Sequence, residues 1–261
     1  SSDLLVAKYL PGFPYADITL RDLLSHRSGL PNYVHFMESL NWDTKVVLTN
    51  QALFDFMVKN YNKLRAGRHN AYFDYCNTNY AMLALVIEKV SNLTYSAYLD
   101  KTFFKPLGME HTFVYSPEMQ DKVLPSFKFN NQKEGVTFLD VVYGDKNIYS
   151  TVRDMLKWDQ AISDGELFTK ATLAEAFKGY SYEKKGIKNY GLGWRLYEMP
   201  SGKKIIYHNG WWHGNNTVFS RIPDDSTTII VLGNKFNRSI YQAKKIIGIY
   251  HGYGFQFNED D

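Results

Sequence analysis

The apolar residues of this chain change their spacing near residue 180, and this change limits the folds that the chain can form. In residues 77–91 the apolar side chains recur at helical spacing. After residue 180 the pattern becomes β-rich in short runs separated by turn residues, at 190–198, 203–208, 216–222 and 227–232. Helices and strands that occupy separate parts of a chain predict an α+β fold, here an antiparallel sheet flanked by helices beside a mostly helical subdomain.

Helix starts are marked by hydroxyl residues that precede apolar segments. We expect N-caps at Thr19, Thr49, Thr94, Ser150 and Thr169, because their side chains accept hydrogen bonds from the first free N–H groups of a helix. We expect the helix capped at residue 19 to end near 24 and the one capped at 94 to end near 104. The helix capped at 150 should end near 162, and the one capped at 169 near 177. Residues 115–145 are polar and predict mostly loop, whereas 239–250 predict a closing helix.

The composition excludes several classes of protein. With 261 residues, 44% of them hydrophobic, the chain can bury a core without disulfides or metal. Its only cysteine, Cys76, excludes an intramolecular disulfide and any multi-cysteine metal centre. A net charge of +3 and short, scattered basic clusters argue against a nucleic-acid partner. The longest apolar run, residues 81–87, is too short to cross a membrane, so no transmembrane segment is expected in this chain.

The first candidate site lies around Tyr75 and Asn77, just before the helix predicted at 77–91. A tyrosine at a helix start can hold its hydroxyl in a cleft, and an asparagine two residues on offers both a donor and an acceptor. The alternative is an ordinary asparagine N-cap beside a core tyrosine. Tyr-x-Asn alone does not distinguish the two.

The second candidate site is His208-Asn209-Gly210, followed by Trp211 and Trp212. We expect it to end a strand, with close backbone approach at the glycine. Such a strand can present a backbone N–H to a developing oxyanion. A plain strand-end turn is the alternative. His208 and the nearby histidine at 213 have no third ligand at suitable spacing, so neither a metal nor another cofactor is expected.

A third block, residues 18–31, reads Ile-Thr-Leu-Arg-Asp-Leu-Leu-Ser-His-Arg-Ser-Gly-Leu-Pro. It resembles the helix and Ser-Gly-Leu turn of the serine β-lactamase and penicillin-binding-protein-like family, which includes class C β-lactamases, DD-peptidases and esterases. Residues 73–80 resemble the Tyr-x-Asn motif of this family, and two further landmarks occur at 104–109 and 148–151. Residues 208–210 stand where the family has Lys-Thr-Gly or His-x-Gly. The resemblance covers essentially the whole chain as a single catalytic domain, 1–261, with a helical subdomain at about 15–148 and a sheet-and-helix part at about 149–261.

The family's nucleophile belongs to a Ser-x-x-Lys motif at the start of a buried helix. Two such strings occur, at 181–184 and 201–204, but both lie in polar turns after the Tyr-x-Asn motif, so we regard them as chance matches. We expect the true motif upstream of Ser1, which makes this chain an N-terminally truncated fragment that is inactive alone. The family's N-terminal strands would then be missing too, leaving an open sheet edge near 227–232 and a route to self-association.

The resemblance also implies roles for the site residues. Tyr75 would move protons to and from the nucleophile, and Asn77 would orient the scissile amide or ester. His208, mostly neutral at pH 7, would anchor a substrate carboxylate only weakly, which favours esterase-like or peptidase-like chemistry. The N–H of Trp211, after Gly210, would form half of the oxyanion hole. Trp211 and Trp212 would wall an apolar or sugar-bearing acyl site, or instead stack into the hairpin.

The expected function is therefore acyl-enzyme hydrolysis of a small acyl, peptide or ester substrate, without cofactor. The alternative is a non-catalytic module of the same fold that binds cell-wall peptides or another ligand. A periplasmic or secreted location in a bacterium is the corresponding expectation.

Overall fold

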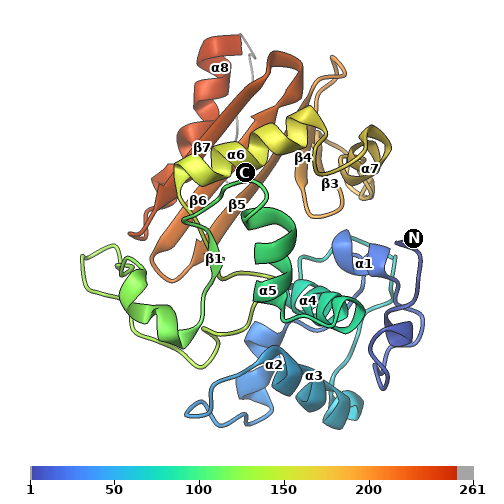
Figure 1. Cartoon of the computed structure of the whole chain (residues 1–261). Helices are drawn as coiled ribbons and strands as arrows, with labels where there is room; N and C mark the ends of the chain where they lie inside the picture. Colours follow the sequence, from blue (N-terminus) through green and yellow to red (C-terminus); the bar gives the residue numbers. More distant parts are fainter. Residues whose placement is uncertain (1, 252–261) are drawn as a thin grey trace.

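The computed structural model describes residues 2–251 and divides them between a helical part and a sheet. The helices of the first part gather below the sheet in Figure 1. They are α1 (Leu20–Leu24), α2 (Tyr33–Ser39), α3 (Asn50–Lys59), α4 (Asn77–Ser91) and α5 (Tyr95–Leu99), the last continuing as a π-helical turn over Asp100–Phe104. Their buried faces form a core around Leu23, Leu53 and Met82. These helices agree with the helical part of the expected α+β fold, and α2 is a helix that the sequence did not predict.

Five antiparallel strands form the sheet in the order β3-β4-β5-β6-β7. They are β3 (Lys188–Tyr190), β4 (Arg195–Glu198), β5 (Lys204–Trp212), β6 (Asn215–Ile222) and β7 (Thr227–Gly233). A separate two-stranded pair joins β1 (Phe113–Val114) to β2 (Ile148–Tyr149). The α+β class is thereby confirmed, and each sheet neighbour is also the neighbour in sequence.

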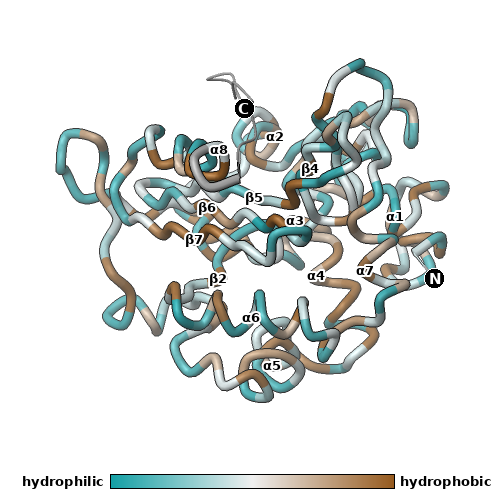
Figure 2. Tube along the Cα trace, turned by 90° about the horizontal axis from the view of Figure 1, so that it is seen from above, coloured by the Kyte–Doolittle hydropathy of each residue, from teal (hydrophilic) through white to brown (hydrophobic). Residues whose placement is uncertain are grey.

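Helices cover both faces of the sheet. Figures 1 and 2 show α6 (Val152–Asp164) on one face and α8 (Lys245–His251) on the other. A buried ion pair between Asp159 of α6 and Arg221 of β6 holds α6 against the sheet. Thr228 of β7 donates a 2.8 Å hydrogen bond to the same carboxylate. On the other face, Ile247 of α8 packs against a cluster that includes Tyr197 and Ile222.

Threonine caps begin most of these helices. Thr19, Thr49, Thr94, Thr151 and Thr169 each accept a hydrogen bond from the N–H three residues on. The prediction of Ser150 as a cap is wrong by one residue. Its hydroxyl lies 2.8 Å from that of Thr112 instead, which leaves the cap of α6 to Thr151.

Two strand predictions need correction. Residues 190–198 are not one strand, because the chain turns through 191–194 between β3 and β4. Glycine permits this turn: Gly193 has φ +83, and a Cβ on Gly191 would lie 2.2 Å from the Ala176 carbonyl oxygen. The 203–208 run is also longer than expected and continues as β5 to Trp212. His208-Asn209-Gly210 therefore lies within a strand and does not end one.

The outer edge of β7 is the end of the sheet as far as residues 2–251 describe it. Only beyond Gly233 does another segment join, where Phe127 pairs with Lys235 and its N–H donates to the Asn234 carbonyl. Phe127 belongs to the long loop predicted at 115–145, which contains a single short 3-10 helix, Pro117–Lys122, among its described elements. This loop thus closes one end of the sheet.

Candidate active site

Tyr75 lies one residue before the N-cap of α4, and its ring contacts the ring of a buried histidine. Cys76 is the N-cap residue of α4, and its N–H donates to His26 Nδ1 at 3.0 Å. The Cys76 thiol donates to the Leu30 carbonyl at 3.3 Å. The Tyr75 and His26 ring centroids lie 4.2 Å apart. Backbone and ring are therefore both fixed where the chain enters the helix, and the tyrosine keeps 36% of its surface exposed.

His26 supports the ring of Tyr75, and the sequence alone did not identify it as a site residue. It is 1% exposed, adopts a left-handed backbone at φ 54, and contacts the rings of Tyr80 and Tyr190 at 5.0 and 4.9 Å as well as Tyr75. Burial, with help from the nearby His208 and Arg195, lowers its pKa to about 3. His26 is thus neutral at physiological pH, with Nδ1 accepting. The sequence shows this histidine within the 18–31 block, but its contacts with the other rings become visible only in the folded structure.

His208 of β5 faces Tyr75 across the junction between helices and sheet, with ring centroids 6.1 Å apart. Its Nδ1 lies 2.8 Å from the Asn209 carbonyl oxygen, which only accepts, so Nδ1 carries the proton. Its Nε2 then accepts from the Tyr190 hydroxyl at 3.2 Å. Burial, and then the positive charge of Arg195, lower the pKa of His208 to about 4. The imidazole is therefore neutral at pH 7, more firmly than its ordinary pKa implies.

Arg195, the first residue of β4, is a site residue that sequence reasoning missed. Pairing of Arg195 with Tyr207 in the sheet register brings it beside the strand that carries His208. Its guanidinium carbon lies 5.2 Å from the centroid of the Tyr75 ring. Partial burial raises the pKa of Tyr75, and Arg195 opposes that rise. Tyr75 is consequently a neutral phenol at pH 7 in this chain. Its hydroxyl can donate a proton, and the cation beside its ring is Arg195.

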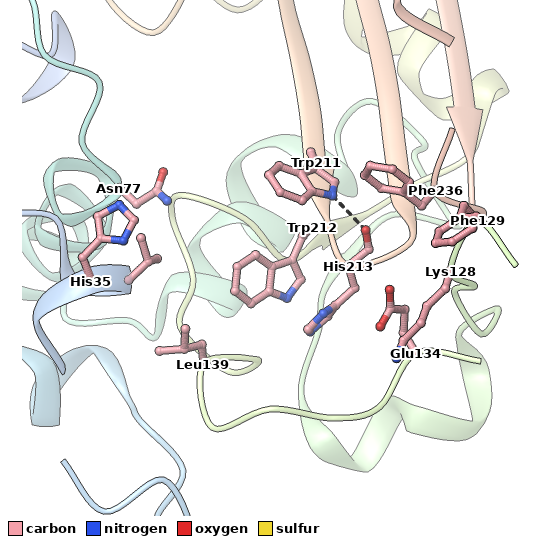
Figure 3. Close-up of a pocket in the computed structure, with 11 residues that line it drawn as sticks. His35, Asn77, Lys128, Phe129, Glu134, Leu139, Trp211, Trp212, His213 and Phe236 are labelled. Carbon is pink, nitrogen blue, oxygen red and sulfur yellow. Dashed lines mark hydrogen bonds between the residues drawn. The ribbon is translucent and has the colours of Figure 1, made fainter. Parts of the chain in front are cut away.

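Asn77 is the first residue of α4 and not its cap, so the N-cap interpretation of this residue is wrong. Asn77 lines a cavity together with Trp211 and Trp212, and Figure 3 shows the two tryptophans between Asn77 on one side and Phe236 on the other. The structure thus places Tyr75 with His208, and Asn77 with the tryptophan pair.

A buried charged pair holds Trp212 in place. The Lys146 ammonium lies 4.5 Å from the centroid of the Trp212 ring and pairs with Asp145, whose carboxylate accepts from the Tyr33 hydroxyl at 2.8 Å. Burial lowers the pKa of Lys146 and raises that of Asp145. On its other side the Trp212 Nε1–H donates to Asp140 at 2.9 Å. Trp212 thus contacts the helical core, and its ring also lies 4.7 Å from the His213 ring of the β5–β6 hairpin.

Gly210 is required by close contact within the sheet. It pairs with Thr217 of β6, and a Cβ on Gly210 would lie 2.3 Å from the Thr217 hydroxyl oxygen. The Gly210 carbonyl accepts from the Tyr241 hydroxyl at 3.0 Å. Since the C=O and N–H of one trans peptide point in opposite directions, the Trp211 N–H points away from Tyr241. The close approach expected at this glycine is present, although the strand does not end there.

Neither serine of the two Ser-x-x-Lys strings begins a helix, and only Ser201 lies in a turn. Ser181 is held by Arg27 and by the Asn189 side chain, and Ser201 lies in the exposed turn between β4 and β5. Within residues 2–251 no group of three His, Cys, Asp or Glu side chains is arranged to hold a metal ion. His213 bonds instead to Asp140, with Nε2 at 2.7 Å from the carboxylate.

A helical part beside an antiparallel sheet, with a Tyr-x-Asn segment facing a His-Asn-Gly strand, defines a penicillin-binding-protein-like architecture. The Beta-lactamase family model matches residues 1–247, and the chain belongs to that family.

Relatives and solved structures agree with this assignment. Penicillin-binding protein 4* of Bacillus subtilis is 33% identical over 255 residues, which cover 91% of this chain and 56% of the relative. Teichoic acid D-alanine hydrolase of Staphylococcus aureus is 32% identical over 250 residues, covering 92% of this chain and 57% of the relative. A penicillin-binding protein from Bacillus halodurans has the same fold, with a TM-score of 0.80, 21% identity, and coverage of 95% of this chain and 77% of that one. The chain thus spans little more than half the length of these two curated relatives.

Proposed function

We propose that the protein is a serine hydrolase that cleaves amide or ester bonds through an acyl-enzyme, and that a Ser-x-x-Lys segment outside these 261 residues supplies the nucleophile. The observation that carries this proposal is the 6.1 Å approach of the Tyr75 and His208 rings, beneath which His26 fixes the tyrosine. A module that only binds ligands has no need of a tyrosine held under a cation. On this proposal the isolated chain is catalytically incomplete.

The site residues divide the work by their chemistry. The serine attacks the acyl carbon, and the resulting oxyanion is stabilised by its own N–H and that of Trp211. As the serine attacks, Tyr75 takes the serine hydroxyl proton and passes that proton to the leaving group, and water then releases the acyl group from the serine. Tyr75 becomes a base only when a further positive charge, from the lysine of Ser-x-x-Lys, lowers its pKa. Asn77 orients the carbonyl of the substrate.

The charge of Arg195 defines the substrate end of the site. Because His208 is neutral and its Nε2 is occupied by Tyr190, the imidazole is a poor anchor for a carboxylate. Arg195 is the cation beside both rings, and it is the residue that attracts a substrate carboxylate. This arrangement favours peptidase-like or esterase-like chemistry.

We propose that the protein acts in the periplasm or outside the cell of a bacterium. The support for this proposal is that a Staphylococcus aureus relative is named as a teichoic acid D-alanine hydrolase. Of the helices between residues 2 and 251, none combines the length and apolar content that crossing a bilayer requires.

A fluorophosphonate probe followed by mass spectrometry tests the hydrolase proposal. Chain 1–261 should form no adduct, whereas a form extended upstream to an in-frame Ser-x-x-Lys should be labelled once, on that serine. Tyr75→Phe in the extended form should react at least tenfold more slowly, while Tyr182→Phe, at an exposed turn, should react normally. Stoichiometric labelling on Ser181 or Ser201, or an unreactive extended form, would overturn the proposal.

The alternative is a ligand-binding module of the same fold. One observation favours it for this chain, namely that Tyr75 and His208 are both neutral and neither is primed as a base. An extended form that binds ligands but resists the probe would establish this alternative.

A further inference from the structure

A cavity of about 630 Å³ opens beside Asn77, and its size is that of a site for a small organic ligand. Its walls come from segments far apart in the sequence: the β5–β6 hairpin, the start of α4, α2, the segment after β7, and the loop around residues 128–139. Because Asn77 also belongs to the proposed catalytic cleft, whatever occupies the cavity lies next to the reacting acyl group. The inference therefore rests on the proposed function.

Two of the aromatic rings that line this cavity remain largely exposed. Trp211 is 68% exposed and Phe129 is 73% exposed. Trp211 is nevertheless held still, because its Nε1–H donates to the His213 carbonyl at 2.9 Å and its ring meets the edge of Phe236 at 5.9 Å. A large apolar ring that is both exposed and fixed provides a preformed stacking surface, because the tryptophan side chain loses little conformational entropy when a ligand binds.

Polar side chains around these rings have free hydrogen-bonding groups. Lys128 and Glu134 of the loop, His35 of α2 and Asn77 of α4 all line the cavity. Among residues 2–251, none of these four side chains has a hydrogen-bonding or ion-pairing partner. Donors and acceptors of both charge signs thus surround a flat apolar surface.

This combination selects the chemistry of the ligand. A hydrocarbon chain would leave Lys128 and Glu134 without partners, and a small anion would be repelled by Glu134 and gain nothing from Trp211. A pyranose ring has an apolar face of C–H groups and an edge of hydroxyls that both donate and accept. We infer that this cavity binds a saccharide ring stacked on Trp211, with its hydroxyls bonded to Lys128 and Glu134, and that the sugar is a neighbouring part of the acyl substrate.

Calorimetry and saturation-transfer NMR on chain 1–261 test the inference. The probes are cellotriose and triacetylchitotriose, with hexaethylene glycol and N-acetyl-D-phenylalanine amide as non-sugar comparisons. At least one trisaccharide should bind saturably, with its pyranose C–H protons receiving the transfer. Trp211→Ala should weaken binding at least tenfold and Trp211→Tyr less than threefold, because tyrosine preserves a stacking face. Glu134→Gln should weaken it severalfold.

Tyr182→Ala is the matched control, because Tyr182 is as exposed as Trp211 but does not line the cavity. It should bind the trisaccharide normally, and circular dichroism should show all variants folded. Binding of neither trisaccharide overturns the inference, and so does binding of the aromatic amide alone or equal binding by the Trp211→Ala variant. These readouts need no nucleophile, so an extended form that fails to react with the fluorophosphonate would remove the hydrolase proposal and leave saccharide binding intact.

Discussion

The guanidinium carbon of Arg195 lies 5.2 Å from the centroid of the Tyr75 ring, so the first residue of β4 places a cation beside the tyrosine that precedes the N-cap of α4. The same charge lowers the pKa values of Tyr75, His208 and His26. One side chain therefore acts on three rings that meet where the helical part contacts the sheet, although burial is the larger cause of each pKa shift.

Replacing Arg195 should raise the pKa of His208. Arg195→Gln removes a positive charge that disfavours the imidazolium, so the pKa should rise above its present value of about 4. It should stay below the ordinary 6.5, because burial is the larger cause. An NMR titration of the histidine ring protons measures this, with Arg195→Lys as the charge-preserving control. An unchanged His208 titration in Arg195→Gln would show that the charge does not reach the ring.

The neutral His26 should make the fold acid-sensitive. The unfolded chain binds a proton on this histidine below about pH 6.5, whereas the folded imidazole stays neutral down to about pH 3. The stabilising contribution is therefore complete above pH 6.5 and is lost as the pH falls, by about 1.4 kcal/mol per pH unit. Urea unfolding at pH 7 and pH 5 should show the loss, and it should be smaller in His26→Asn. Equal stability at both pH values would contradict the assigned burial.

The buried pair of Asp159 and Arg221 should matter far more than an exposed one. Asp159→Ala leaves Arg221, which is 5% exposed, with an uncompensated charge, and should lower the free energy of unfolding by about 3–5 kcal/mol. Asp100→Ala, which removes an exposed partner of Lys105, is the control and should cost at most about 1 kcal/mol. Thermal unfolding compares the two, and similar losses would argue against a desolvated pair.

The open edge of β7 should let the isolated chain associate. Unpaired N–H and C=O groups beside Ile229, Ile230 and Val231 can pair with a second chain. Light scattering should show concentration-dependent oligomers that Leu232→Lys reduces, because a charged side chain at the edge opposes pairing. Leu124→Lys, at an exposed loop position, should leave association unchanged. A stable monomer with slow amide exchange over residues 227–232 would show that this edge is already protected.

Sequence alone was sufficient for the features that depend on neighbouring residues. Threonine caps at 19, 49, 94 and 169 follow from a hydroxyl before an apolar period, and the β6–β7 hairpin follows from two β-rich runs around a Pro-Asp-Asp turn. The order and spacing of the motifs also indicated the family, because both can be read from the sequence without knowing how the segments pack. Because these signals depend on neighbouring residues, they can be recognised in the sequence without a structure.

Tertiary structure decided everything that depends on which distant segments meet. Tyr75 and His208 are more than a hundred residues apart, and only the tertiary fold brings the segment before α4 next to β5. Arg195 carries no motif, and its role appears only when sheet register places it beside β5. The cap at Thr151 and the break within 190–198 were likewise set by contacts with Thr112 and Ala176. The local sequence pattern determines which helices and strands form. Burial and strand register determine which side chains share a site, because the interaction energies behind them arise between segments that are distant in the sequence.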